Sequence, residues 1–300
     1  MRVRALVPFA DVPVPSGVLL DHYDGVGAPP ADVSDVEFYV LPYDRGDQPA
    51  ELIAKMPALR AVQALTAGVD RLLPVVPPQV PLYNGSGLHD ASTAEHALAL
   101  MLAAQRELPR WLDRQAHQRW DHELTGSVAG SRVTILGHGA IGRALQRRLV
   151  AAEAEITKVA AHARPAEDVH AVTELPSLLP STDILVMILP DSPATVGLVG
   201  ARELALLPDG ALVVNVGRGR TLDTEALLAE LTARRLRAAL DVTDPEPLPA
   251  DHPLWTMPGV LITPHVAGGS STFWPRARTF VAEQLRRFVA DEPLLNPVPR

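Results

Sequence analysis

The chain of 300 residues contains no cysteine. That absence excludes disulfide bonds, thiolate zinc sites, iron–sulfur clusters and a cysteine nucleophile. Lysine is nearly as rare: only Lys55 and Lys158 are present, and neither lies near a motif, so a Schiff-base mechanism has few candidates. A chain without cysteine fits a reducing cytoplasm, which is the location that we expect.

Long apolar runs and blocks of positive charge are missing as well. The longest apolar stretch, residues 97–104, is far shorter than the roughly 18–20 residues that a membrane span needs. The formal net charge is −8. We therefore expect neither a membrane nor a nucleic acid as partner. The ten histidines show no spacing typical of metal ligands, so no metal site is expected.

The first part of the chain alternates short apolar runs with turns rich in proline, glycine and aspartate. This pattern predicts a small α/β unit with strands at residues 3–7, 18–22, 37–41, 59–65 and 80–83 and a helix near residues 50–55. Ser92-Thr93-Ala94-Glu95 then has the form of a capping box, which predicts that Ser92 caps a helix over residues 94–106. A second, polar helix is predicted over residues 110–123.

From Ser131 onward strands alternate with helices. Such alternation predicts a parallel, doubly wound sheet. The expected strands are residues 133–136, 156–161, 184–188, 211–215, 237–240 and 260–262, and the expected helices are residues 140–151, 201–206, 224–233 and 272–290.

A glycine-rich turn, Gly137-His138-Gly139-Ala140-Ile141-Gly142, follows the first of these strands. Gly137 would allow the tight turn, Gly139 would let the backbone approach a pyrophosphate, and Gly142 would let helix and strand pack closely. A helix is expected to start at Ala140, and the free N–H groups of its first residues, Ala140 and Ile141, would bind the phosphates. The motif predicts a dinucleotide site, although a strand–helix turn without a ligand is the simpler alternative.

The next strand should end in an acid that binds the ribose hydroxyls of NAD. Instead it runs into His162-Ala163-Arg164-Pro165. Arg164 could pair with a 2′-phosphate, which favours NADP over NAD as the cofactor. A solvated arginine beside a site indifferent to that phosphate is the alternative.

Three later strands each deliver one functional side chain just beyond their ends: Arg218 in Asn215-Val216-Gly217-Arg218-Gly219, Glu246 between Pro245 and Pro247, and His265 after Thr263-Pro264. Ligands bind at that edge of an open parallel sheet. An arginine there can hold a carboxylate with two hydrogen bonds. Glu246 beside His265 would raise the pKa of the imidazole and make it a proton donor to a carbonyl. Taken singly, Arg218 could equally well be a surface arginine in a helix-capping turn, and a loop glutamate such as Glu246 is more often solvated than functional.

Together these motifs resemble the D-isomer-specific 2-hydroxyacid dehydrogenases, the family of glyoxylate/hydroxypyruvate reductases and D-lactate dehydrogenases. The stretches that carry the resemblance are Leu65-Thr66-Ala67-Gly68-Val69-Asp70, Ala94-Glu95, the glycine-rich turn, Leu189-Pro190 with Thr195, Asn215–Gly219, Ala239-Leu240-Asp241-Val242, Pro245-Glu246-Pro247 and Thr263-Pro264-His265.

The resemblance implies an α/β protein of two domains, in which a Rossmann-type doubly wound parallel sheet is inserted into a smaller flavodoxin-like α/β domain. Residues 1–92, completed by residues 280–300, would form the substrate-binding domain, and residues 93–279 the dinucleotide-binding domain. It also implies a homodimer formed through the dinucleotide domain, and a small 2-oxo or 2-hydroxy acid as substrate.

The resemblance further implies roles for single residues. Arg218 would bind the substrate carboxylate and keto oxygen, while Glu246 and His265 form the acid/base pair. The backbone N–H groups of Ala67 and Gly68 would hold the substrate carboxylate from the other domain. The implied cofactor contacts, beyond the glycine-rich turn, are His162, Arg164, Pro190, Thr195, Val216, Gly217 and Asp241.

Other activities of the same fold remain open from the sequence. A formate dehydrogenase would carry glutamine in place of Glu246, so the carboxylate argues against it. A phosphite dehydrogenase is harder to exclude. A corepressor that only senses the dinucleotide is a third alternative, although the triad of Arg218, Glu246 and His265 is retained here.

Overall fold

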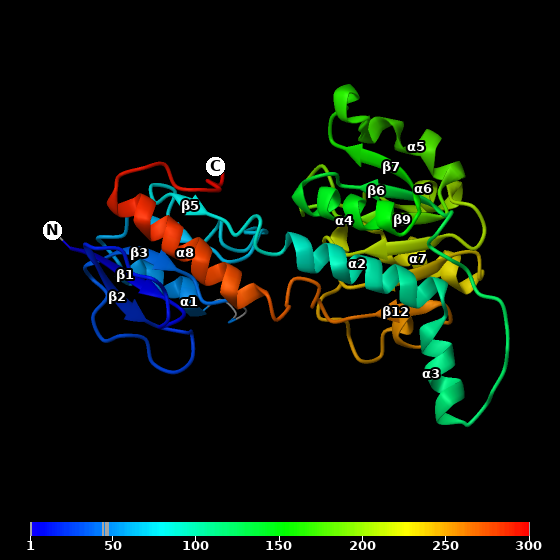
Figure 1. Ribbon diagram of the computed structural model, residues 1–300, viewed down its shortest axis with the longest axis horizontal. Helices are drawn as coiled ribbons and strands as arrows, with labels where there is room; N and C mark the ends of the chain where they lie inside the picture. Colours follow the sequence, from blue (N-terminus) through cyan, green and yellow to red (C-terminus); the bar gives the residue numbers. More distant parts are fainter. Residues whose placement is uncertain (1, 44, 46–47, 300) are drawn as a thin grey trace. The chain divides into compact units, whose positions relative to one another are not determined.

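The protein is described by a computed structural model that covers residues 2–43, 45 and 48–299. The chain divides into two compact units, Met1–His89 with Ser271–Arg300, and Asp90–Ser270. Each is a parallel sheet with helices packed against it (Figure 1), which confirms the predicted α/β class.

The first unit has the strand order β2-β1-β3-β4-β5, the order of flavodoxin-like sheets. Successive residues of β1 face opposite sides: Ala5 and Val7 pack in the core beneath helix α8, and Leu6 packs in the core on the other face. Its elements are β1 (Val3–Val7), β2 (Val18–His22), β3 (Val36–Val40), α1 (Gln48–Glu51), a 3-10 turn (Leu52–Lys55), β4 (Ala61–Gln63), β5 (Leu82–Tyr83) and α8 (Phe273–Val289).

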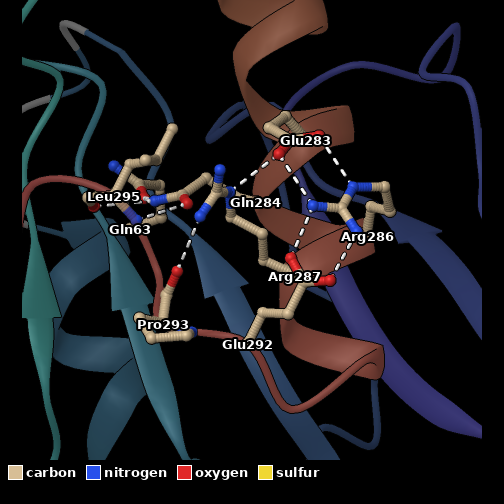
Figure 2. A network of polar contacts seen from close by, with 8 residues as sticks. All are labelled: Gln63, Glu283, Gln284, Arg286, Arg287, Glu292, Pro293 and Leu295. Atoms are coloured by element: carbon tan, nitrogen blue, oxygen red, sulfur yellow. Dashed lines mark hydrogen bonds and ion pairs between the residues drawn. The ribbon is translucent and has the colours of Figure 1, made fainter.

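A buried polar network fastens the end of the chain to this unit (Figure 2). Gln284 of α8 is fully buried, and its amide nitrogen donates to Oε1 of Gln63 at 2.5 Å and to the carbonyl of Leu295 at 3.0 Å. The N–H of Leu295 donates back to Oε1 of Gln284 at 2.9 Å. Because every buried amide atom needs a partner, this network specifies how the last residues return to the sheet.

The second unit has a seven-stranded sheet in the order β12-β11-β10-β9-β6-β7-β8. The order reverses direction at β6, as expected for a doubly wound sheet. Its strands are β6 (Arg132–Leu136), β7 (Glu155–Ala160), β8 (His170–Ala171), β9 (Ile184–Met187), β10 (Leu212–Asn215), β11 (Arg237–Leu240) and β12 (Val260–Ile262). Its helices are α2 (Asp90–Gln105), α3 (Leu108–Ala116), α4 (Ala140–Ala151), α5 (Leu175–Leu178), α6 (Ala201–Leu206) and α7 (Thr224–Thr232), with 3-10 turns at Pro165–Glu167, Val172–Glu174, Leu179–Ser181, Gly219–Thr221 and Pro253–Trp255.

Continuous apolar runs become the central strands because both faces of the sheet are covered. In β10, Leu212 and Val214 pack on one face with residues of α2 and α4. Val213 packs on the other face with residues of α6 and α7.

Two predicted helix boundaries are wrong. Helix α2 begins at Asp90, so Ser92 lies inside its first turn and its hydroxyl donates to the carbonyl of Gly268 instead of capping the helix. Helix α3 ends at Ala116 rather than near Glu123, because Gln118 has a left-handed φ of 55° that a helix cannot continue through. In the described part of the chain, no helix combines the length and the apolar character needed to cross a membrane.

Candidate active site

The loops that follow β10, β11 and β12 lie at one edge of the second unit's sheet. These strands are neighbours and parallel, so their carboxyl ends meet at that edge. Arg218 follows β10, Glu246 lies in the loop after β11, and His265 follows β12. The structure therefore brings the three predicted catalytic residues to the same edge of one unit.

His265 and Glu246 form a direct pair. Nδ1 of His265 lies 2.7 Å from Oε1 of Glu246, and about half of the imidazole is exposed. Since a carboxylate can only accept, Nδ1 carries a proton, and Nε2 is the ring nitrogen that Glu246 does not contact. The hydrogen bond to Glu246 raises the pKa of His265, against the opposing effects of burial and of the positive charge on Arg218.

A buried asparagine shapes the loop that carries Arg218. Asn215 is fully buried at the end of β10. Its amide nitrogen donates to the carbonyl of Arg218 at 3.0 Å, and its oxygen accepts from the N–H of Gly217 at 3.0 Å. The hydroxyl of Thr221 donates to the same carbonyl at 2.7 Å. The backbone of Arg218 is thus held from both sides.

The carboxylate of Asp241 organises the backbone after His265. It is buried and accepts from the hydroxyl of Thr263 at 2.6 Å and from the N–H groups of Val266 and Ala267 at 3.0 and 2.9 Å. Burial would raise the pKa of Asp241, but these hydrogen bonds and that from His96 outweigh it and lower the pKa. The role predicted for Asp241 at the nicotinamide stays a prediction, because its oxygens are taken up by the chain itself.

Helix α2 contributes a histidine to this network. Thr263 donates its only hydroxyl proton to Asp241, so its oxygen accepts from Nε2 of His96 at 3.0 Å. His96 also lies 3.3 Å from Asp241. The loop that carries His265 is therefore anchored to both β11 and α2.

The glycines beside Arg218 serve the chain's own packing. A side chain at Gly217 would collide with the backbone of Leu189, and one at Gly219 with the carbonyl of Thr243. At both positions a neighbouring loop of the same unit approaches the backbone closely.

The glycine-rich turn fits a dinucleotide phosphate. A side chain at Gly137, whose φ is +111°, would strike the carbonyl of Ile188, and one at Gly142 would strike the carbonyl of Gly137. At Gly139 a side chain would meet nothing within 4 Å, so this position faces open space. Helix α4 begins at Ala140, and its first N–H groups have no acceptor within the helix. The turn thus combines close packing on one side with an accessible helix N-terminus on the other.

For other predicted cofactor contacts the structure shows only burial and contacts within the chain. The hydroxyl of Thr195 donates to the carbonyl of Pro190 at 2.7 Å and accepts from the N–H of Ser192 at 2.9 Å, so it shapes its own loop. Val216 is buried, and His162 is exposed. Their contacts with a cofactor stay predictions.

Ala67 and Gly68 belong to the first unit. They lie in a turn that the hydroxyl of Thr66 closes by donating to the carbonyl of Gly68 at 2.7 Å. Their share in substrate binding also stays a prediction.

Sequence reasoning missed several polar residues around the site. Asn215 and Thr263 stood inside the quoted motifs without an assigned role, and the signal for Asn215 was a polar residue ending an apolar strand. Nothing near His96 in the sequence pointed to Asp241, because 145 positions separate them along the chain and only the fold joins them.

Comparison with known proteins agrees with this geometry. Residues 98–267 match the model of the D-isomer specific 2-hydroxyacid dehydrogenase, NAD binding domain. A D-3-phosphoglycerate dehydrogenase of Mycobacterium bovis is 33% identical over 251 residues, which are 81% of this chain and 47% of that protein. The chain thus spans about half the length of that relative.

Two shorter relatives match over most of their length. Glyoxylate/hydroxypyruvate reductase A of Yersinia enterocolitica is 32% identical over 237 residues, 73% of this chain and 74% of that protein. The crystal structure of a D-isomer specific 2-hydroxyacid dehydrogenase from Xanthobacter autotrophicus, in complex with NADPH and MES, is similar with a TM-score of 0.80 and 30% identity, covering 99% of this chain and 98% of that one. These matches confirm the expected family and the expected class of cofactor, NAD or NADP.

Proposed function

Because the chain belongs to the D-isomer specific 2-hydroxyacid dehydrogenase family, we propose that it reduces a small 2-oxo acid to the D-2-hydroxy acid, and catalyses the reverse, by hydride transfer with NADPH or NADH. The observation that carries the proposal is the pair of His265 and Glu246, 2.7 Å apart, on the same sheet edge as Arg218. A bound nicotinamide would supply the hydride; the chain supplies binding, orientation and the proton.

Each catalytic residue has one task in this proposal. The guanidinium of Arg218 binds the substrate carboxylate and polarises the keto oxygen. Nε2 of His265 donates a proton to that oxygen as the hydride reaches the carbon, and takes the proton back in the reverse direction. Glu246 keeps His265 protonated, in line with the raised pKa. The N–H groups of Ala67 and Gly68 hold the carboxylate from the first unit.

The substrate class is small 2-oxo acids such as glyoxylate and hydroxypyruvate. Both are named for the reductase relative from Yersinia enterocolitica. Turnover should be measured for glyoxylate, hydroxypyruvate, pyruvate, and bulkier and aromatic 2-oxo acids, each with NADPH and with NADH. Reduction of at least one acid supports the proposal. No turnover of any acid would overturn it in favour of a dinucleotide-sensing module, and oxidation of phosphite would favour a phosphite dehydrogenase.

NADP is the preferred cofactor in this proposal, with NAD as the alternative. No acid ends strand β7, and Arg164 follows it instead. Its guanidinium lies beside the glycine-rich turn, where Nη2 donates to the carbonyl of His138 at 2.8 Å. A guanidinium at that position suits a 2′-phosphate. A clearly higher kcat/KM with NADH than with NADPH would refute the preference.

The proposal includes a homodimer built through the second unit. Helix α3 has no buried residue, and it leads into an extended segment at the edge of that unit (Figure 1). Arg114 makes ion pairs with Asp121 and Glu123 that fix this segment to the helix. Even so, Trp120 and Leu124 are 99% and 94% exposed. Large apolar side chains exposed to water are typical of a surface that a second copy covers.

Sedimentation of the variant Trp120→Asp with Leu124→Asp tests the dimer. The variant should sediment as a monomer, while Val150→Asp, a change at another exposed apolar residue of this unit, should not alter the mass. A dimeric double variant, or a monomeric native protein, would refute this interface. A cytoplasmic location, suggested by the lack of cysteine, stays a prediction.

A further inference from the structure

The second residue of the glycine-rich turn is a buried histidine with two polar partners. His138 is 4% exposed. Nε2 lies 2.8 Å from the amide oxygen of Gln146 on α4, and Nδ1 lies 3.0 Å from Nη2 of Arg164. Position two of this motif needs no particular side chain to bind a pyrophosphate, so the turn itself does not explain this network.

The partners define the protonation state of His138. A guanidinium can only donate, so Nδ1 of His138 must accept and carries no proton. Nε2 then carries the proton and donates it to Gln146. Burial, together with the nearby charges of Arg164, Lys158 and Arg143, lowers the pKa of His138, in agreement with a neutral ring.

Three of the five N–H groups of Arg164 are committed by this arrangement. Nη2 donates both to Nδ1 and to the carbonyl of His138, and Nε donates to Oε1 of Glu167 at 3.1 Å. For Nη1 the structure shows no hydrogen-bond partner among residues 2–43, 45 and 48–299. The side chain is 34% exposed. Two N–H groups of a fixed cation are therefore left to bind an anion.

The backbone around Arg164 is fixed as well. Arg164 and Val169 exchange hydrogen bonds of 2.8 and 3.2 Å, which close a tight turn. Lys158, one of the two lysines of the chain, is nearly buried and donates to the carbonyl of Glu167 at 2.6 Å. Only the side chain of Arg164 remains to be oriented. Glu167 holds its Nε, and His138 holds its Nη2.

We propose that His138 is a positioning residue for cofactor specificity, because its neutral ring holds the guanidinium of Arg164 at the turn to bind the 2′-phosphate of NADP(H). A lysine or arginine in its place would repel Arg164. An aliphatic residue would leave Nη2 with the backbone carbonyl as its one acceptor, and the guanidinium would be oriented less firmly. The inference rests on the proposed NADP preference.

Binding of 2′,5′-ADP and of 5′-AMP by calorimetry tests the proposal without any turnover. The two compounds differ by the 2′-phosphate, so the ratio of their dissociation constants measures its recognition. In the native protein 2′,5′-ADP should bind more tightly. His138→Leu should weaken 2′,5′-ADP by about tenfold, the value of one hydrogen bond to a charged group, and leave 5′-AMP unchanged.

Two further variants separate positioning from folding. His138→Asn keeps an acceptor close to the position of Nδ1 and should restore much of the discrimination. Arg164→Ala should abolish it, and His138→Leu should cause no further loss in that background, because the two residues act as one unit. Unchanged 5′-AMP affinity shows that each variant is folded.

The outcomes distinguish the two claims. Equal affinity of the native protein for both compounds, or no effect of Arg164→Ala, would refute the NADP preference and the inference with it. An effect of Arg164→Ala with none of His138→Leu would overturn the inference alone. Additive losses in the double variant would also overturn it.

Discussion

Two histidines of the second unit use the same ring nitrogen, Nδ1, in opposite hydrogen-bonding roles. Nδ1 of His265 faces the carboxylate of Glu246, and Nδ1 of His138 faces the guanidinium of Arg164. The hydrogen bond to Glu246 raises the pKa of His265, whereas burial and nearby positive charges lower the pKa of His138. His265 is half exposed and able to exchange a proton, whereas His138 is buried and is not.

The comparison shows how one residue type acquires two roles from its neighbours. A carboxylate at Nδ1 stabilises the charged imidazolium, which suits a catalytic acid. A donor-only guanidinium at Nδ1 requires the neutral ring, which suits a fixed acceptor. Changing either histidine should therefore disturb a different property of the enzyme.

The largest effect is expected at His265. His265→Ala should lower kcat for reduction of the 2-oxo acid by about 10²- to 10⁴-fold, the usual contribution of a general acid, with cofactor affinity unchanged. His170→Ala is the matched control, because His170 is also an exposed histidine paired with a glutamate, 3.0 Å from Glu174. Near-native kcat in His265→Ala, measured by steady-state kinetics, would remove His265 from the mechanism.

Arg218 is the next residue to test, because in the proposed mechanism it binds the substrate and its charge also lowers the pKa of His265. Arg218→Ala should lower kcat/KM by about 10²-fold or more, since a charge-assisted grip on the carboxylate is lost. It should also raise the pKa of His265, because the charge of Arg218 lowers that pKa. Steady-state kinetics across pH measures both. Arg220→Ala, an exposed arginine two residues away, is the control, and equal losses in both variants would contradict the role of Arg218.

A small effect on stability should also follow from the pair of His265 and Glu246. The pKa of His265 is raised in the folded protein, so the pair stabilises the fold fully below the ordinary histidine value of about 6.5 and ceases to do so as pH rises through the raised pKa. Chemical unfolding at a series of pH values, native against Glu246→Gln, measures the difference. A difference that grows with rising pH would contradict the assigned direction.

Much of this could be predicted from the sequence because its signals are local. Apolar runs bounded by turns predicted the central strands, and the glycine-rich turn, Arg218, Glu246 and His265 each stood at a strand end. The edge of a parallel sheet then brings such residues together whatever their distance along the chain.

The rest depended on contacts that no local pattern encodes. His96 reaches Asp241 only because α2 packs on the sheet, and Arg164 reaches His138 only because β7 lies beside β6. The short elements β8 and α5 also escaped prediction, since two to four residues carry no periodicity. The end of α3 was misjudged because polar, charged sequence continues past the helix into the extended segment.

The central claim is that Glu246 keeps His265 protonated so that it can serve as the acid. The most direct measurement is the pH dependence of kcat/KM for reduction in the native protein, in Glu246→Gln and in the control Glu174→Gln. We predict that reduction declines as pH rises through the raised pKa of His265, and that this decline moves to lower pH in Glu246→Gln but not in Glu174→Gln. The same pH dependence in all three proteins would contradict the account.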